Sequence, residues 1–77
     1  MNETLQTIEK ERMIELTKYA YKTYKFVRKI VTEPAIFDDV NFAFSKYFFY
    51  MRMLTTIYPE LNREELESEW NKEIEND

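Results

Sequence analysis

The stretch from Asp38 to Tyr58 constrains the fold most, because it is predicted to form one helix with more apolar surface than a single packing face needs. At 100° per residue, a first apolar stripe contains Val40, Ala43, Phe44, Tyr47, Met51, Leu54 and Tyr58. A second stripe, on another flank, contains Phe42, Phe49, Met53 and Ile57, and Tyr50 lies between the two stripes. A helix that is apolar on most sides is normally buried on most sides. In a chain of 77 residues, this burial requires two neighbouring segments, a partner chain, or both.

Glycine is absent from the chain, and proline occurs at only two positions, Pro34 and Pro59. The absence of glycine excludes Gly-rich phosphate loops, dinucleotide-binding fingerprints and glycine caps at helix C-termini. Abundant Glu, Lys, Leu and Met favour helices joined by short connections. We therefore expect an all-α fold in which residues 1–77 form a single, small three-helix domain.

The first of these helices is expected to be long, from about residue 4 to residue 31, with Asn2 or Thr4 as its cap and Pro34 behind its end. Its expected core stripe contains Met13, Leu16, Ala20, Thr23, Val27 and Ile30, widened by Tyr19 and Phe26. A helix of this length spans about 40 Å, whereas a compact chain of this size has a radius of gyration of about 11–12 Å. We therefore expect the first turns to bend, to fray or to reach past the core.

The second helix is expected over residues 38–58, with Asp38 or Asp39 as its cap and Pro59 at its end. In the connection before it, Ile36 and Phe37 are expected to pack into the core. Short connections favour antiparallel neighbours, so the first two helices should form an antiparallel pair.

The third helix, over residues 63–74, is short and acidic and has the clearest local signature. Asn62 is the predicted N-cap and Glu65, three residues later, completes a capping-box-like pair. Leu61 and Leu66 are spaced as a hydrophobic staple around that cap. A narrow apolar edge, expected to close over the first two helices, is formed by Leu66, Trp70 and Ile74.

Charge is segregated along the sequence. A basic face of the first helix, with Tyr21 among its residues, contains Lys18, Lys22, Lys25, Arg28 and Lys29. This face could contact phosphates, with Tyr21 stacking on a base, or it could lie on a membrane surface. We favour a third interpretation, in which the face is solvated and neutralised by the acidic third helix of the same or another chain. The net charge of −4 also argues against nonspecific binding to nucleic acid.

The catalytic inventory is nearly empty. The sequence has no His and no Cys, so it lacks a usual general base, a thiol nucleophile and a zinc ligand set. Paired acids such as Glu64-Glu65 fall at predicted helix starts, where acids are expected on electrostatic grounds. We therefore expect no enzyme activity, no catalytic residue, no metal and no cofactor. The chain also shows no signal peptide and no membrane-inserting stretch, so a cytoplasmic location is expected.

Three functional hypotheses remain. The first is a non-catalytic protein–protein interaction module, a small inhibitor, adaptor or regulator that acts as a homodimer. For this first hypothesis, the composition of the chain suggests an accessory protein of the kind that phages or mobile elements encode. The second is a nucleic-acid-binding regulator that uses the basic face, and the third is a small assembly chaperone or structural component. For the first hypothesis, the expected partner-binding or self-association residues are Phe42, Phe49, Tyr50, Met53 and Ile57.

Overall fold

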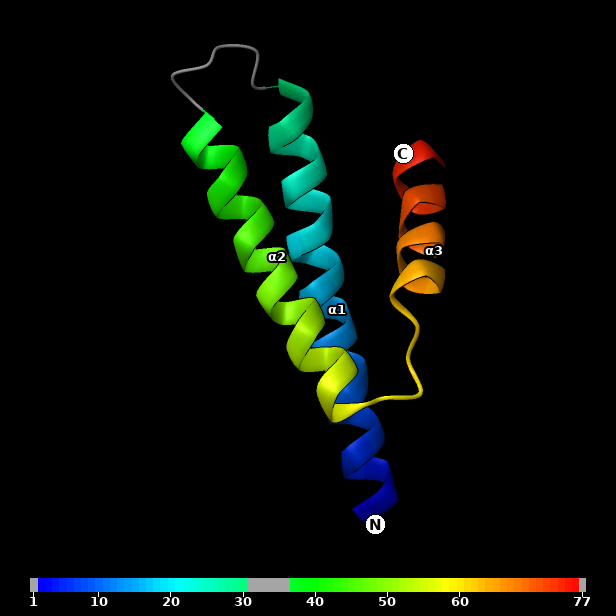
Figure 1. Cartoon of the computed structure of the whole chain (residues 1–77). Coiled ribbons are helices and arrows are strands. Elements are labelled where there is room, and N and C mark those ends of the chain that lie inside the picture. The colour runs from blue at the N-terminus through cyan, green and yellow to red at the C-terminus, as the bar shows by residue number, and fades with distance from the viewer. Residues whose placement is uncertain (1, 31–36, 77) are drawn as a thin grey trace.

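The computed structural model describes the backbone of residues 2–30 and 37–76, and the side chains of residues 7–30 and 39–76. It contains three helices, α1 (Asn2–Ile30), α2 (Phe37–Ile57) and α3 (Arg63–Asn76), and no strand in the described ranges. The chain therefore has the predicted all-α, three-helix fold (Figure 1). Over the same ranges, no helix is both long enough and apolar enough to cross a membrane.

The helix ends differ from the predicted ones by two residues at most. The start of α1 is Asn2, and the end of α3 is Asn76. Because α2 begins at Phe37, the acids at 38 and 39 lie inside its first turn and neither is its cap. The predicted packing of Ile36 and Phe37, and the side chains proposed to cap α1, lie outside the described residues.

The helices α1 and α2 run antiparallel and form a hairpin, as predicted (Figure 1). Tyr47, Met51 and Leu54 of α2 are buried in it, in agreement with the first apolar stripe. Tyr24 of α1 stacks on Tyr47 with 6.3 Å between ring centroids, and its ring lies 5.2 Å from that of Phe44. Aromatic pairs at these separations add about 0.5–1.5 kcal/mol each beyond the area that they bury.

The predicted core stripe of α1 is confirmed only in part. Ala20 is buried as predicted, and Met13 and Val27 are half-buried. Leu16, Tyr19, Phe26 and Ile30 are all exposed, and Tyr19 retains 72% of its accessible surface. Among the described side chains of α1, the buried ones are Thr17, Ala20 and Tyr21.

Hydrogen bonding explains how polar residues replace the aliphatic stripe of α1. Thr17 is buried because its hydroxyl donates to the backbone carbonyl of Met13 at 2.7 Å. The hydroxyl of Tyr21 donates to Oδ1 of Asn71 in α3 at 2.8 Å. A hydrogen-bonded hydroxyl removes most of the penalty for burying these side chains.

The third helix begins and packs as predicted. Oδ1 of Asn62 accepts a hydrogen bond from the backbone N–H of Glu65 at 3.1 Å, which satisfies one free donor of the first turn. Trp70 is buried, and Leu66 and Ile74 pack against the same core. The ring of Trp70 lies 5.6 Å from that of Tyr21, so α3 docks on the aromatic side of the hairpin.

The molecule is elongated, with principal extents of 50 × 25 × 18 Å and a radius of gyration of 14.1 Å. Nζ of Lys10 pairs with Glu60 at 2.8 Å and lies 5.5 Å from the ring centroid of Tyr58. Because Tyr58 and Glu60 follow the end of α2, Lys10 lies where the packing of α1 on α2 ends. The turns of α1 before Lys10 run past α2 (Figure 1). The first turns of α1 were expected to bend, to fray or to reach past the core, and in the structure they reach past it as an overhang.

Candidate interaction surface

The second apolar stripe of α2 is open to solvent. Phe42 retains 73% of its accessible surface and Phe49 retains 61%, while Met53 and Ile57 are also exposed. Tyr50 is half-buried, and its ring centroid lies 6.3 Å from that of Phe49. Phe42, Phe49, Met53 and Ile57 therefore lie on a flank of α2 that the rest of the described chain leaves open, whereas Tyr50 lies at its edge and packs partly against the core.

A small crevice joins this flank to α1. It has a volume of about 170 Å³ and is lined by Met13, Leu16, Thr17, Tyr50 and Met53. Its walls are almost entirely apolar, and its volume is comparable to that of cavities that hold one benzene-sized group, about 150 Å³. The crevice places Leu16 of α1 beside Met53 of α2.

The apolar surface continues to both sides of the crevice. On α2, Met53 also lines a shallow depression with Phe49 and Ile57. We refer to the contiguous surface as the hairpin face and define it by Leu16, Phe49, Tyr50, Met53 and Ile57.

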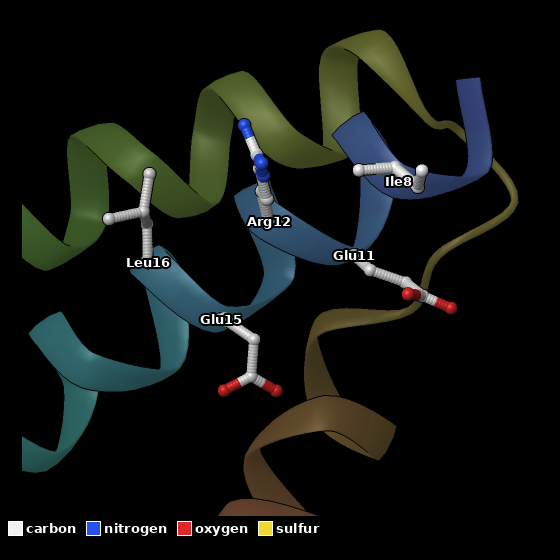
Figure 2. Close-up of a pocket in the computed structure, with 5 residues that line it drawn as sticks. All are labelled: Ile8, Glu11, Arg12, Glu15 and Leu16. Atoms are coloured by element: carbon white, nitrogen blue, oxygen red, sulfur yellow. The ribbon is translucent and has the colours of Figure 1, made fainter. Parts of the chain in front are cut away.

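On α1, the surface extends from Leu16 toward the overhang. Leu16 and Ile8 line a second shallow depression together with Glu11, Arg12 and Glu15 (Figure 2). All five side chains come from α1, and Glu15 points to the side of α3 while Leu16 points to the side of α2 (Figure 2). The exposed overhang is therefore continuous with the hairpin face through Leu16.

The helix α3 lies on the other side of the hairpin. Its Arg63 guanidinium lies 5.7 Å from the ring centroid of Phe48, and its Trp70 packs on Tyr21. Phe48 and Met53 are about 140° apart around α2 at 100° per residue. Because α3 contacts the flank of Phe48, it leaves the flank of Met53 open.

The sequence reasoning missed Leu16, which was assigned to the core and is 59% exposed. The signal that could have found it is Thr17, whose hydroxyl can bond to the carbonyl four residues earlier and so be buried. With Thr17 inward, Leu16 moves about 100° to the flank of the hairpin.

The basic face of α1 is partly neutralised within the chain. Nζ of Lys18 lies 3.1 Å from Glu15 and 3.5 Å from Glu73 of α3, and Nζ of Lys22 lies 3.8 Å from Glu73. The hydrogen bond that Lys18 donates to Glu15, together with the negative charges of Glu15 and Glu73, raises the pKa of Lys18. For these two lysines, the predicted neutralisation by the acidic third helix of the same chain is confirmed.

The other cations differ in their contacts. Nζ of Lys25 lies 5.5 Å from the ring centroid of Tyr21, and Arg28 donates to the hydroxyl of Tyr24 at 3.3 Å. Lys29 is exposed and has no ion pair within the described residues. In the nucleic-acid alternative, Tyr21 is not available to stack on a base, because only 3% of its surface is accessible.

The side chains of the described ranges include one tyrosine with a shifted pKa and no cluster of metal ligands. They contain no group of three or more His, Cys, Asp or Glu that could hold a metal ion. Burial and a hydrogen bond to the carboxylate of Glu67 raise the pKa of Tyr47 well above its ordinary value. This phenol therefore stays protonated near neutral pH and serves as a donor that ties α2 to α3.

No protein-family model, no curated protein and no solved structure matches the chain. Any functional inference therefore depends on the surface described above.

Proposed function

We propose that the chain is a non-catalytic protein–protein interaction module, a small inhibitor, adaptor or regulator that binds protein through the hairpin face. The observation that carries this proposal is the continuity of the apolar surface. Leu16, Met53 and Phe49 come from two helices, and they line depressions that share walls. Scattered apolar side chains are normal on a protein surface, whereas a contiguous patch marks an interaction site.

Burial of this face would release substantial free energy. Phe49, Met53 and Ile57 are each exposed, and full burial of such a side chain is worth about 1.5–3 kcal/mol. Part of that gain is offset by the lost freedom of the two partners, so the net affinity is smaller than the sum. Met53 lies at the centre, and its unbranched side chain can adapt to a partner surface.

Contacts on α1 count against the nucleic-acid alternative. Lys18 and Lys22 already face Glu73, and Tyr21 is buried. A phosphate would have to compete with a carboxylate of the same chain at both lysines. The third hypothesis, an assembly chaperone or structural component, would use the same apolar surface as the main proposal. The two differ in the complex expected on purification, which would be a large assembly in the third hypothesis.

Affinity purification from the native cell tests the proposal. A tagged wild-type chain should recover a protein in stoichiometric amount, while Phe49→Glu should lose it because a charge at this position cannot be desolvated cheaply. Tyr19→Glu is the matched control, since Tyr19 is a more exposed aromatic that lines none of the depressions of the hairpin face. Equal recovery with wild type and Phe49→Glu would contradict the proposal. Recovery of no protein, not even untagged copies of the chain, would also contradict it.

A further inference from the structure

The chain as a whole exposes an unusually large surface for its size. The accessible surface is 6225 Å², whereas a compact monomer of this mass is expected to expose about 5,000 Å². The excess is larger than the roughly 800 Å² that each partner buries in a standard stable interface. One interface of ordinary size would therefore bring the chain to the exposure of a compact protein.

Two of the charges on the flank of the hairpin face, Glu9 and Lys46, are arranged in a self-complementary way. Glu9 lies seven residues before Leu16 and Lys46 lies seven residues before Met53, so each charge is two turns away on the same side of its helix. Because α1 and α2 are antiparallel, the two charges lie in opposite directions from the crevice that Leu16 and Met53 line, each about 10 Å along its helix. Both are exposed, and neither has an ion pair within the described residues.

We propose that the occupant of the hairpin face is a second copy of this chain, related by a twofold axis that passes near Leu16 and Met53. This inference rests on the proposed function and names its partner. A twofold rotation that reverses the helix direction superimposes the two apolar faces and brings Glu9 of one copy to the same end of the interface as Lys46 of the other. The operation makes this pairing twice, and it buries both copies of the crevice at the centre.

A partner of a different sequence fits these observations less well. Charges of both signs border the face, with Arg12 and Glu15 beside Leu16 and Arg52 beside Phe49. A partner of one sign would therefore meet like charges as well as opposite ones. A second copy carries both signs at the spacing that the twofold axis requires. The same axis leaves α3 on the outer side of each subunit, away from the interface.

Light scattering after size exclusion, at micromolar concentration, tests the pairing through the molar mass. The chain has a mass of 9.5 kDa, so wild type and Tyr19→Glu should elute with twice that mass. Phe49→Glu and Leu16→Glu should both elute as single chains with unchanged helical content by circular dichroism. The second variant guards against a local fold defect caused by the first.

A charge exchange tests the twofold register. Glu9→Lys and Lys46→Glu should each raise the dissociation constant of the dimer several-fold, because each places like charges at both ends of the interface. The double variant Glu9→Lys/Lys46→Glu should restore the wild-type constant. Failure of this rescue, or a wild-type mass of one chain, would overturn the inference.

The two proposals can fail separately. A monomeric wild type that still recovers a cellular partner, lost in Phe49→Glu, would overturn self-association and retain the interaction module. A monomeric wild type that recovers nothing would overturn both.

Discussion

The hydroxyl of Tyr21 in α1 donates a hydrogen bond to Oδ1 of Asn71 in α3, across 2.8 Å. The hydroxyl of Tyr47 in α2 makes the equivalent contact with the carboxylate of Glu67. Two buried rings thus supply apolar area to the hairpin core and turn their polar ends toward the same short helix. The helix α3 is therefore held to the hairpin both by hydrogen bonds and by the buried apolar ring of Trp70.

Replacement of that anchor should be costly. Trp70 retains 3% of its accessible surface, so Trp70→Ala should lower the free energy of unfolding by about 3–5 kcal/mol. Trp70→Phe should cost less, because it keeps a ring against Tyr21. Urea denaturation followed by circular dichroism measures both values. An unchanged midpoint for Trp70→Ala would show that α3 does not dock on the hairpin in solution.

The cap of α3 should contribute on a smaller scale. Asn62→Ala removes the acceptor of the Glu65 N–H group and should cost about 0.5–2 kcal/mol. Asn41→Ala is the control, because Asn41 is exposed within α2 and its change to the best helix former should not destabilise the chain. Equal midpoints for the two variants in thermal melts would argue against the cap.

The raised pKa of Tyr47 predicts a loss of stability at alkaline pH. Burial and the Glu67 contact hold the folded-state pKa above the ordinary value of 10.0, so the folded state keeps its proton more tightly than the unfolded state. The corresponding stability is fully present below pH 10.0 and is lost as the pH rises above that value toward the folded pKa.

Tyr47→Phe separates this effect from general alkaline unfolding. The variant should be less stable near neutral pH, by about 1.5–3 kcal/mol for a hydrogen bond to a charged group. Its stability should also fall less steeply above pH 10.0 than that of wild type. Denaturation curves at a series of pH values check both statements, and parallel pH profiles for the two proteins would contradict them.

The sequence was informative where local signals were strong. Pro59, Asn62 and the spacing of Leu66, Trp70 and Ile74 were enough to place α3, and the missing glycine was enough to exclude whole classes of site. The stripes of α2 could be read from periodicity because one of them is buried and the other is open.

The orientation of α1 could not be read in the same way. Its aliphatic residues form a regular stripe, but the structure buries Thr17 and Tyr21, whose hydroxyl groups find partners at Met13 and Asn71. One of these partners lies 50 residues away in the sequence, so periodicity within α1 carries no information about it. The error also hid Leu16, and with it the α1 half of the hairpin face.

If the hairpin face becomes buried against protein while α3 covers the other side, the two surfaces should differ in their accessibility to reagents. The chain has no cysteine, so a single introduced thiol reports on its own position. Thr56→Cys places that thiol in the depression of Phe49 and Ile57, and Ser68→Cys places it on the exposed side of α3.

The deciding measurement is the rate of alkylation of each thiol as protein concentration rises from nanomolar to micromolar, and again after addition of any protein recovered from the cell. We expect alkylation of Thr56→Cys to slow in at least one of these titrations, while that of Ser68→Cys stays constant. A rate for Thr56→Cys that depends on neither concentration nor partner would show that the hairpin face is not a protein-binding surface.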